Sequence, residues 1–305
     1  YYLCMNTTRV RAYIYLLIVT AIWGIAGPII KFTLGGFDPL TFLTYRFGLS
    51  FFVALITFFI VKIHLPKDKK TFWKLLGFGF LTSTVSLGFL FFGLENTTVL
   101  DMSLITLATP LLVTIAGVMF LNEHVTRMEK IGMGIALFGT LLTVIEPLIQ
   151  NGHDAIRLSG NIFIVGSLIA TAWSAVLAKE LLRKDVSPLL MTNASFIVGF
   201  LSLLPFAIFL RPSILYSLFT IHYTYHIGVF YMALLSGSLA YYLSNKAQKS
   251  IEIGEASIFA YLYPIFSTPL AVIWLGEKIT PMFTMGAVII AIGVAIAEIK
   301  KRRYN

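Results

Sequence analysis

The sequence predicts an all-α membrane protein in which ten transmembrane helices form two inverted repeats of five helices. Composition is the first observation: 58% of the 305 residues are hydrophobic and 12% are charged, whereas about a quarter of a soluble globular chain is charged. The second is that apolar runs of about twenty residues, long enough to cross a bilayer, recur along the chain. The third is an internal duplication, in which the second half of the chain repeats the first.

The duplication is clearest where residues 110–139 align with residues 264–293 at a constant offset of 154 and without a gap. Ten of the thirty aligned positions are identical. Apolar bias alone gives matches of leucine, isoleucine or valine, but it does not readily give a shared proline, a shared glutamate and two shared glycines in one register. The sequence therefore contains an internal repeat. Its motif consists of Pro110 and Glu123 in the first copy and of Pro264 and Glu277 in the second.

Turn and charged residues separate the predicted spans. The breaks are at Gly35-Gly36 with Asp38-Pro39, at 66–70, at 122–124, at 151–154 and at 183–185. The spans are residues 12–30, 40–61, 73–93, 101–121, 126–145, 160–180, 188–210, 224–245, 255–275 and 281–298. The first methionine is Met5, and no cleavable signal is expected, because the first apolar run is a full span with no small-residue cleavage site behind it. The longest connection, a loop at 146–159, joins a first repeat at 12–145 to a second repeat at 160–298.

The distribution of lysine and arginine predicts the orientation. With both termini on one face, 18 of the 23 basic residues fall on that face, four fall on the other, and Arg46 lies inside a span. Such an excess marks the cytoplasmic side, so we expect a multi-pass protein of the cell (plasma) membrane with both termini in the cytoplasm. Five helices per repeat force the second copy to enter the membrane inverted. Inverted repeats are typical of secondary transporters, whose substrate site lies near the midplane between the repeats.

Composition and motifs exclude several kinds of site. The single Cys4 excludes a disulfide framework and thiolate metal sites, and the sequence has no zinc-binding HExxH pair, nucleophile elbow or phosphate loop. We therefore expect no catalytic residue, no metal and no cofactor. The net charge of +9 does not indicate nucleic acid, because the basic residues gather on one membrane face. The expected partners are the lipid bilayer and a small-molecule substrate.

Several residues occur in a combination that resembles a known family. Trp23-Gly24 and Lys31 lie in the first span, Pro39 and Arg46 lie in the second, and the proline–glutamate motif occurs twice. This combination resembles the EamA-type, ten-helix members of the drug/metabolite transporter superfamily over essentially residues 12–298. The resemblance implies an exporter-like fold with a central cavity, lined mainly by the first, third, fourth, sixth, eighth and ninth helices. It also implies substrates such as amino acids or other small metabolites.

Arg46 is the only basic residue well inside a span, and aligning Pro39 with Pro188 places Ser195 at the equivalent position of the second repeat. Arg46 lies about 10 Å beyond Pro39 at 1.5 Å per residue. Its guanidinium could snorkel to the membrane surface, or it could face inward and bind a substrate carboxylate or an acid. Leaving the charge in hydrocarbon costs about 2.5–3.5 kcal/mol, so we expect an inward-facing side chain.

Four acidic residues near span ends are candidates for structural or coupling roles. Glu123 and Glu277 each precede, by three residues, the threonine at which the next helix starts. We interpret both as structural, because a carboxylate there suits the free amides of that helix. Glu95 and Asp101 flank the turn between the third and fourth spans, beside the expected cavity mouth. Either is a candidate proton-coupling group, and the alternative is a solvated loop acid.

Polar and aromatic residues at membrane depth complete the candidate substrate site. A polar group at that depth needs a partner, and a cavity supplies one; the alternative for the aromatic residues is packing against lipid or the core. Trp23 and Trp173 occupy nearly equivalent places in the first and sixth spans. The candidates for substrate binding, besides Arg46, are Trp23, Thr109, Trp173, Tyr241, Asn245, Tyr261 and Tyr263.

Small residues recur along one face of the fifth span and one face of the tenth. Spacing of this kind allows two helices to approach closely, so it indicates helix packing or a homodimer. The faces consist of Gly132, Ala136 and Gly139, and of Ala287, Ala291 and Ala295, with Gly293 and Ala297 beside them.

Together these patterns predict a secondary transporter of exporter type, which moves a small metabolite by alternating access around a midplane cavity. Within transport, a nucleotide-sugar carrier is the alternative, because its superfamily shares the ten-helix plan. Outside transport, the alternative is an intramembrane enzyme or an interaction scaffold. The inverted duplication favours transport, because an enzyme rarely needs a site symmetric about the midplane.

Overall fold

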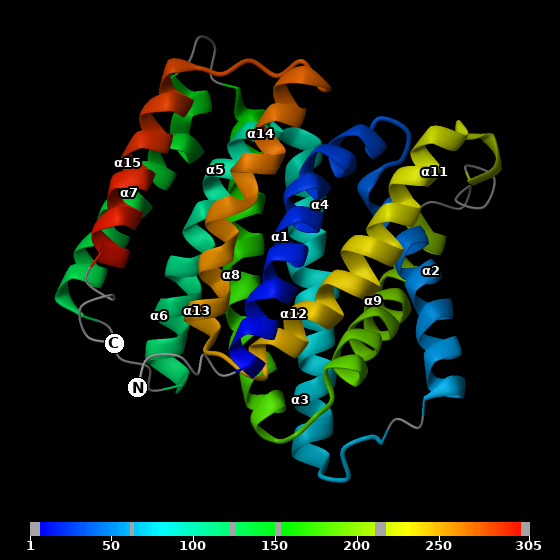
Figure 1. Cartoon of the computed structure of the whole chain (residues 1–305). Helices are drawn as coiled ribbons and strands as arrows, with labels where there is room; N and C mark the ends of the chain where they lie inside the picture. The colour runs from blue at the N-terminus through cyan, green and yellow to red at the C-terminus, as the bar shows by residue number, and fades with distance from the viewer. Residues whose placement is uncertain (1–6, 62–63, 122–125, 150–153, 211–217, 300–305) are drawn as a thin grey trace.

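The computed structural model describes residues 7–61, 64–121, 126–149, 154–210 and 218–299. Their helices pack into one bundle, and the described chain ends lie toward the same end of it, called here the terminal face (Figure 1). Within these residues, nine helical segments are long and apolar enough to cross a membrane, and a shorter apolar helix follows at the end. The prediction of an all-α protein with ten spans in two inverted repeats is confirmed. Some of the most exposed side chains are apolar, such as Phe59 at 89% and Ile273 at 84%, which suits a surface that faces lipid.

The first repeat contains five spans, two of which change helix type along their length. They are α1 (Thr7–Thr33), α2 (Pro39–Ile60), the segment α3 (Lys69–Gly79), η1 (Phe80–Ser86) and α4 (Leu87–Asn96), the segment α5 (Val99–Ile105), η2 (Thr106–Ala108) and α6 (Thr109–Leu121), and α7 (Arg127–Ile149).

The second repeat has the same order of elements. Its spans are α8 (Ala155–Arg183), α9 (Pro188–Leu210), the segment α11 (Tyr223–Phe230), η3 (Tyr231–Leu239) and α12 (Ala240–Gln248), the segment α13 (Ile253–Ser257), η4 (Ile258–Leu262) and α14 (Tyr263–Ile273), and α15 (Pro281–Ile299).

The connection between the repeats is shorter than the predicted loop at 146–159. Helix α7 continues to Ile149, and α8 already begins at Ala155. The early start has a local cause, because the Asp154 carboxylate accepts a hydrogen bond from the Arg157 amide at 2.9 Å and so caps the first turn of α8.

The two repeats share their irregular turns as well as their helices. The third span of each contains a π-helix, η1 or η3, and the fourth contains a 3₁₀ turn, η2 or η4. Each 3₁₀ turn is followed closely by a repeat-motif proline. Pro110 and Pro264 are the second residues of α6 and α14. A proline is tolerated in the first turn of a helix, since the amide hydrogen that it lacks has no partner within the helix there.

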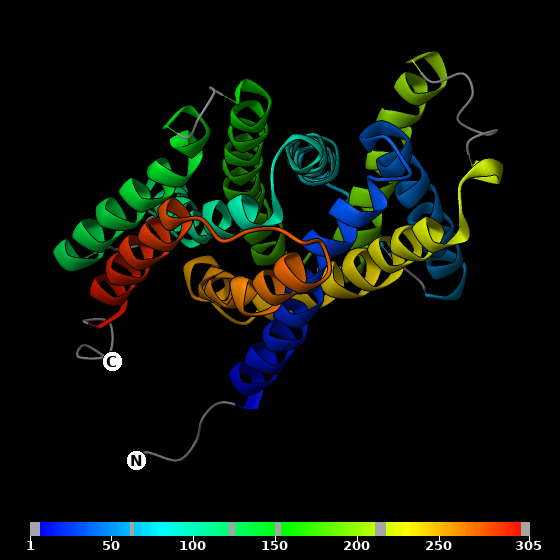
Figure 2. The same cartoon turned by 90° about the horizontal axis from the view of Figure 1, so that it is seen from above.

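Helices α7 and α15 lie side by side at one edge of the bundle (Figure 2). Glycines allow the close approach: a Cβ atom on Gly293 would lie 2.5 Å from the Ala136 amide nitrogen and 2.7 Å from the Gly132 carbonyl oxygen. A Cβ on Gly139 would lie 2.8 Å from the Ile290 side chain. The small residues of the fifth and tenth spans therefore pack against each other within one chain.

This packing corrects the expected homodimer for the α7 face. Gly132, Ala136 and Gly139 are covered by α15, so they cannot meet a second copy of the chain. On α15, the contact uses Gly293 rather than the predicted row of alanines, since Ala291 and Ala295 are exposed. A homodimer that forms through the exposed alanines of α15 remains a prediction.

Replacing Gly293 with leucine should lower stability without changing the order of substrate preference. The new side chain has no room beside Ala136, so it must push α15 away from α7, and overpacking of this kind costs about 1–3 kcal/mol. Gly134→Leu is the matched control, because Gly134 is exposed on α7 and a Cβ there meets nothing within 4 Å. Thermal unfolding in detergent measures the difference, and equal melting temperatures for the two variants would contradict the packing argument.

Candidate functional site

A cavity of about 260 Å³ lies between the two repeats, close to the lower end of small-molecule sites, which measure about 300–1,000 Å³. Three spans of each repeat line it: α1, α3–α4 and α5–α6 from the first, and α8, η3–α12 and α13–α14 from the second. These are the six helices that the resemblance implied. Among the described residues, Arg46 on α2 is the one lining residue from any other span.

The cavity walls repeat the internal symmetry of the chain. Six lining residues of α8 follow six of α1 at a constant offset of 148, and five of the α13–α14 segment follow five of the α5–α6 segment at 154. Corresponding positions of the two inverted repeats therefore face the same space. The pairs are Val19/Ser167, Thr20/Leu168, Trp23/Thr171, Ala26/Ser174, Gly27/Ala175 and Ile30/Ala178, then Met102/Ala256, Ser103/Ser257, Thr106/Ala260, Thr109/Tyr263 and Val113/Ser267.

Two predicted binding residues lie outside the cavity lining. Trp173 is 48% exposed and packs against Phe120, with the ring centroids 4.7 Å apart. The offset of 148 pairs Trp23 with Thr171, and two further residues rotate a helix by about 200°, so Trp173 faces away from the cavity. Tyr261 packs against the hydrophobic core instead. The cavity lining therefore includes neither Trp173 nor Tyr261.

Arg46 is fully buried, and it is the one charged side chain among the lining residues. None of its three guanidinium nitrogens has a hydrogen-bond partner among the described residues. The rings of Phe47 and Phe91 flank it, each with its centroid 5.6 Å from the Arg46 Cζ atom, as in a cation–π contact. The snorkelling alternative is therefore wrong, because the side chain ends inside the protein.

The other predicted binding residues do line the cavity. Trp23 donates its indole N–H to the Ser236 carbonyl at 3.0 Å, and its ring meets the Tyr241 ring edge-on with centroids 5.0 Å apart. Asn245 donates to the Thr192 hydroxyl at 3.1 Å. Thr109 and Tyr263 face the cavity as a repeat-related pair.

Hydroxyl groups of the cavity were missed by the sequence reasoning. The Ser86 and Thr171 hydroxyl oxygens lie 2.7 Å apart and join the two repeats, while the Thr82 hydroxyl is buried and has no hydrogen-bond partner in the described parts of the chain. These residues could have been recognised in the sequence, because serine or threonine recurs every three or four residues within an apolar span and so lies on one face of the helix. Thr82 and Ser86 show this spacing in the third span, as do Ser167, Thr171 and Ser174 in the sixth.

Neither candidate for proton coupling lines the cavity. Glu95 is exposed near the opposite face, at the end of α4. Asp101 is 1% exposed, and Arg157 donates to both of its carboxylate oxygens at 2.7 Å. The alternative of a solvated loop acid is thus wrong for Asp101, because the first turn of α8 brings an arginine to it across the repeat boundary.

Glu277 caps a helix, but not the helix that follows it. Its two carboxylate oxygens accept hydrogen bonds from the Val99 and Leu100 amides, at 2.8 and 2.9 Å, at the start of α5. Gly276 makes the preceding turn with a φ of +69°, which glycine adopts without strain. Burial raises the pKa of the Glu277 carboxyl group above its usual value, and the two amide donors oppose that shift. Glu123, the matching residue of the first repeat, lies outside the described residues.

The inverted repeats and the cavity that they share define a membrane transporter as the class of protein. The chain belongs to the EamA-like transporter family, whose sequence pattern matches residues 10–145 and again residues 158–298.

Similar proteins carry transporter names. The chain is 28% identical to "Uncharacterized transporter YyaM" of Bacillus subtilis, with 97% of each chain covered. It is 27% identical to "Probable amino-acid metabolite efflux pump" of Salmonella typhimurium, with 92% of each covered, and 24% identical to the Escherichia coli protein of the same name, also with 92% of each covered. A solved crystal structure shares the fold, with a TM-score of 0.68, 15% identity and 98% of each chain covered.

Removing the Glu277 carboxylate should destabilise the protein, because Glu277→Ala leaves two amides at the start of α5 without acceptors. An unsatisfied buried donor costs about 1–3 kcal/mol, and the melting temperature in detergent should fall accordingly. Because the folded pKa is raised, the part of the stability that is linked to protonation of this group is fully present below its ordinary pKa and is lost as pH rises through the raised value, while the amide hydrogen bonds remain. Melting curves over a pH series should show that decline in the wild type and lack it in Glu277→Ala. A variant that matches the wild type at every pH would refute the cap.

Proposed function

We propose that the protein is a secondary transporter of exporter type, which moves a small metabolite with an anionic group, such as an amino acid, by alternating access around the cavity. The observation that carries the proposal is the buried guanidinium of Arg46, which has no hydrogen-bond partner in the cavity wall.

The charge of the cavity indicates the substrate class. Its lining contains Arg46 but no aspartate or glutamate among the described residues, so no acid compensates the guanidinium. A buried charge without a partner is costly, and a bound carboxylate would supply both the opposite charge and two acceptors for bidentate hydrogen bonds. This favours an anionic or zwitterionic substrate over a cationic one.

The remaining lining suits a small amphipathic molecule. Trp23, Tyr241 and Tyr263 offer aromatic faces, and Thr82 offers a hydroxyl group that has no partner among the residues the structure describes. Two similar proteins are named for amino-acid metabolite efflux, which supports this substrate class and the export direction. A nucleotide-sugar carrier is supported less well, because a diphosphate would bring two charges to one arginine in a cavity of about 260 Å³.

The symmetry of the cavity supports alternating access. Matching residues of the two inverted repeats line it from both sides, so rocking one repeat against the other would open it to each membrane face in turn. We take residues 12–145 and 160–298 as the two moving units, joined by the connecting segment 146–159. An intramembrane enzyme finds no support in the lining, which holds no histidine, cysteine or carboxylate among the described residues.

Substitution of Arg46 tests the proposed substrate contact. In a thermal-shift screen against the twenty amino acids and a set of small monocarboxylates, the wild type should be stabilised by at least one compound. Arg46→Lys should bind that compound about ten- to a hundredfold more weakly, because an ammonium group cannot reproduce bidentate geometry and a charge-assisted hydrogen bond contributes about 1.5–3 kcal/mol. Arg46→Ala should abolish measurable binding.

Ser195→Ala is the matched control for Arg46, because Ser195 is the equivalent position of the second repeat and is fully buried outside the cavity lining. This variant should keep the wild-type affinity. Wild-type affinity in folded Arg46→Lys protein would remove Arg46 from the substrate site.

Orientation can be measured independently of transport. We place the terminal face in the cytoplasm of a plasma-membrane protein, because the predicted spans assign 18 of the 23 lysines and arginines to that side. In a Cys4→Ser background, a cysteine at position 69 in intact cells should resist a membrane-impermeant thiol reagent, whereas a cysteine at position 278, on the opposite face, should react. The reverse pattern would overturn the assignment.

A further inference from the structure

Several ion pairs join the repeats outside the cavity, and two of them occupy corresponding positions of the repeats, one toward each membrane face. We propose that these pairs, Arg157–Asp101 and Arg9–Glu255, are the two gates of the transport cycle. The inference rests on the proposed alternating access, and it adds four functional residues that do not line the cavity.

The four residues occupy corresponding positions of the inverted repeats. Arg9 and Arg157 are each the third residue of the first helix of a repeat, while Asp101 and Glu255 are each the third residue of the fourth span. The arginines are 148 positions apart and the acids 154. These are the two offsets that relate the cavity walls, so the ion pairs obey the same symmetry as the walls.

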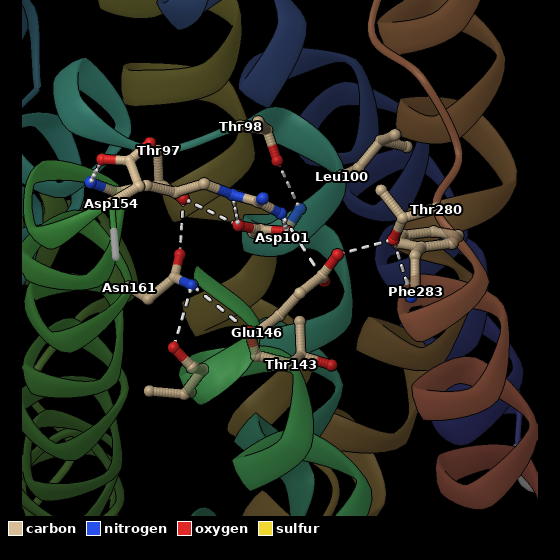
Figure 3. Close-up of polar contacts among 12 residues, drawn as sticks. Thr97, Thr98, Leu100, Asp101, Thr143, Glu146, Asp154, Asn161, Thr280 and Phe283 are labelled. Atoms are coloured by element: carbon tan, nitrogen blue, oxygen red, sulfur yellow. Dashed lines mark hydrogen bonds and ion pairs between the residues drawn. The ribbon is translucent and has the colours of Figure 1, made fainter. Parts of the chain in front are cut away.

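The pair toward the opposite face is buried and strongly connected (Figure 3). Arg157 binds Asp101 through Nε and Nη2, both at 2.7 Å, and the two side chains are 18% and 2% exposed. The Thr97 hydroxyl donates to Asp101 at 3.1 Å and lies within hydrogen-bond distance of Asn161. Glu146 lies 3.5 Å from Arg157, so the arginine keeps an acidic neighbour even without Asp101.

The ion pair toward the terminal face also joins an arginine to an acid of the other repeat, but its side chains are more exposed. Arg9 Nη2 lies 2.7 Å from Glu255 Oε1, and the side chains are 52% and 22% exposed. The Tyr13 hydroxyl donates to the same carboxylate. Tyr13 is the counterpart of Asn161 at the offset of 148, so a polar residue one turn after the arginine is part of both networks.

Each pair links the first helix of one repeat to the fourth span of the other, and both of these spans line the cavity. Rocking the repeats apart at one face must separate the pair at that face. The cavity lining reaches Gln248 and Ile253 toward the terminal face, where the ion pair is the more exposed one. Loss of either pair should therefore shift the population toward opening at its own face, as expected when one of two states loses a stabilising contact.

Cysteine accessibility in proteoliposomes tests the gates without any substrate. Ala175, a cavity residue, is replaced by cysteine in a Cys4→Ser background, and a membrane-impermeant maleimide is added to each face in turn. Asp101→Asn should raise the labelling rate from the opposite face by about tenfold, within the usual range of conformational coupling. Glu255→Gln should raise labelling from the terminal face instead. The double variant Asp101→Arg with Arg157→Asp should restore labelling toward the starting rate.

The matched control is Asp185→Asn, which breaks the exposed pair of Asp185 with Lys249 within the second repeat and should change neither rate. If Asp101→Asn fails to fold, Arg157→Lys should still raise labelling from the opposite face, because it keeps the charge but loses the bidentate contact. Unchanged rates, or equal increases from both faces, would overturn the gates. Since no substrate is present, this outcome is separate from a failure of the proposed function, which substrate binding by the Arg46 variants decides.

Discussion

The structure depends on satisfying backbone polar groups where helices end against the bundle, because a carbonyl group shielded from water needs a partner within the protein. Lys31 meets this requirement at the end of α4, where its ammonium group donates to the carbonyls of Leu94, Glu95 and Thr97 at 2.6–3.1 Å. Lys179, its counterpart at the offset of 148, donates to the Gln248 and Ile251 carbonyls after α12. A cation suits the negative end of the helix dipole. These contacts let the third and fourth spans of each repeat turn sharply, and those spans form much of the cavity wall.

The cavity walls are lined by matching residues of the two repeats, but the one charged lining residue, Arg46, has no charged counterpart in the second repeat. The paired lining residues are mostly small, apolar or hydroxyl-bearing, so the walls alone make a mildly polar chamber. Arg46 adds the charge, whereas its counterpart Ser195 is uncharged and donates to the Thr192 carbonyl within α9. Because only one repeat supplies a guanidinium, a bound anion would have a fixed place, while the matching walls allow the chamber to open toward either face.

Much of the fold could be predicted from the sequence, because membrane spans depend on local properties. Apolar length, turn residues and the repeated proline–glutamate motif located all ten spans, and the absence of a matching charge at Ser195 showed that Arg46 is not a general requirement of the repeat. The constant offset of 154 also paired Thr109 with Tyr263, which both line the cavity. These features were readable because bilayer thickness and the chain duplication act on consecutive residues.

Other features were decided only by the tertiary structure, because they depend on which surfaces meet. Trp23 and Trp173 look equivalent in the sequence, but the packing of α8 pairs Trp23 with Thr171 and turns Trp173 outward. Glu277 precedes one helix and caps another, since the turn at Gly276 carries its carboxylate to α5. Asp101 looks like a loop acid until α8 brings Arg157 against it. The sequence by itself determined the spans, their inverted order and the one basic residue well inside a span, whereas the partners of the side chains followed from helix rotation and from contacts between residues far apart in the chain.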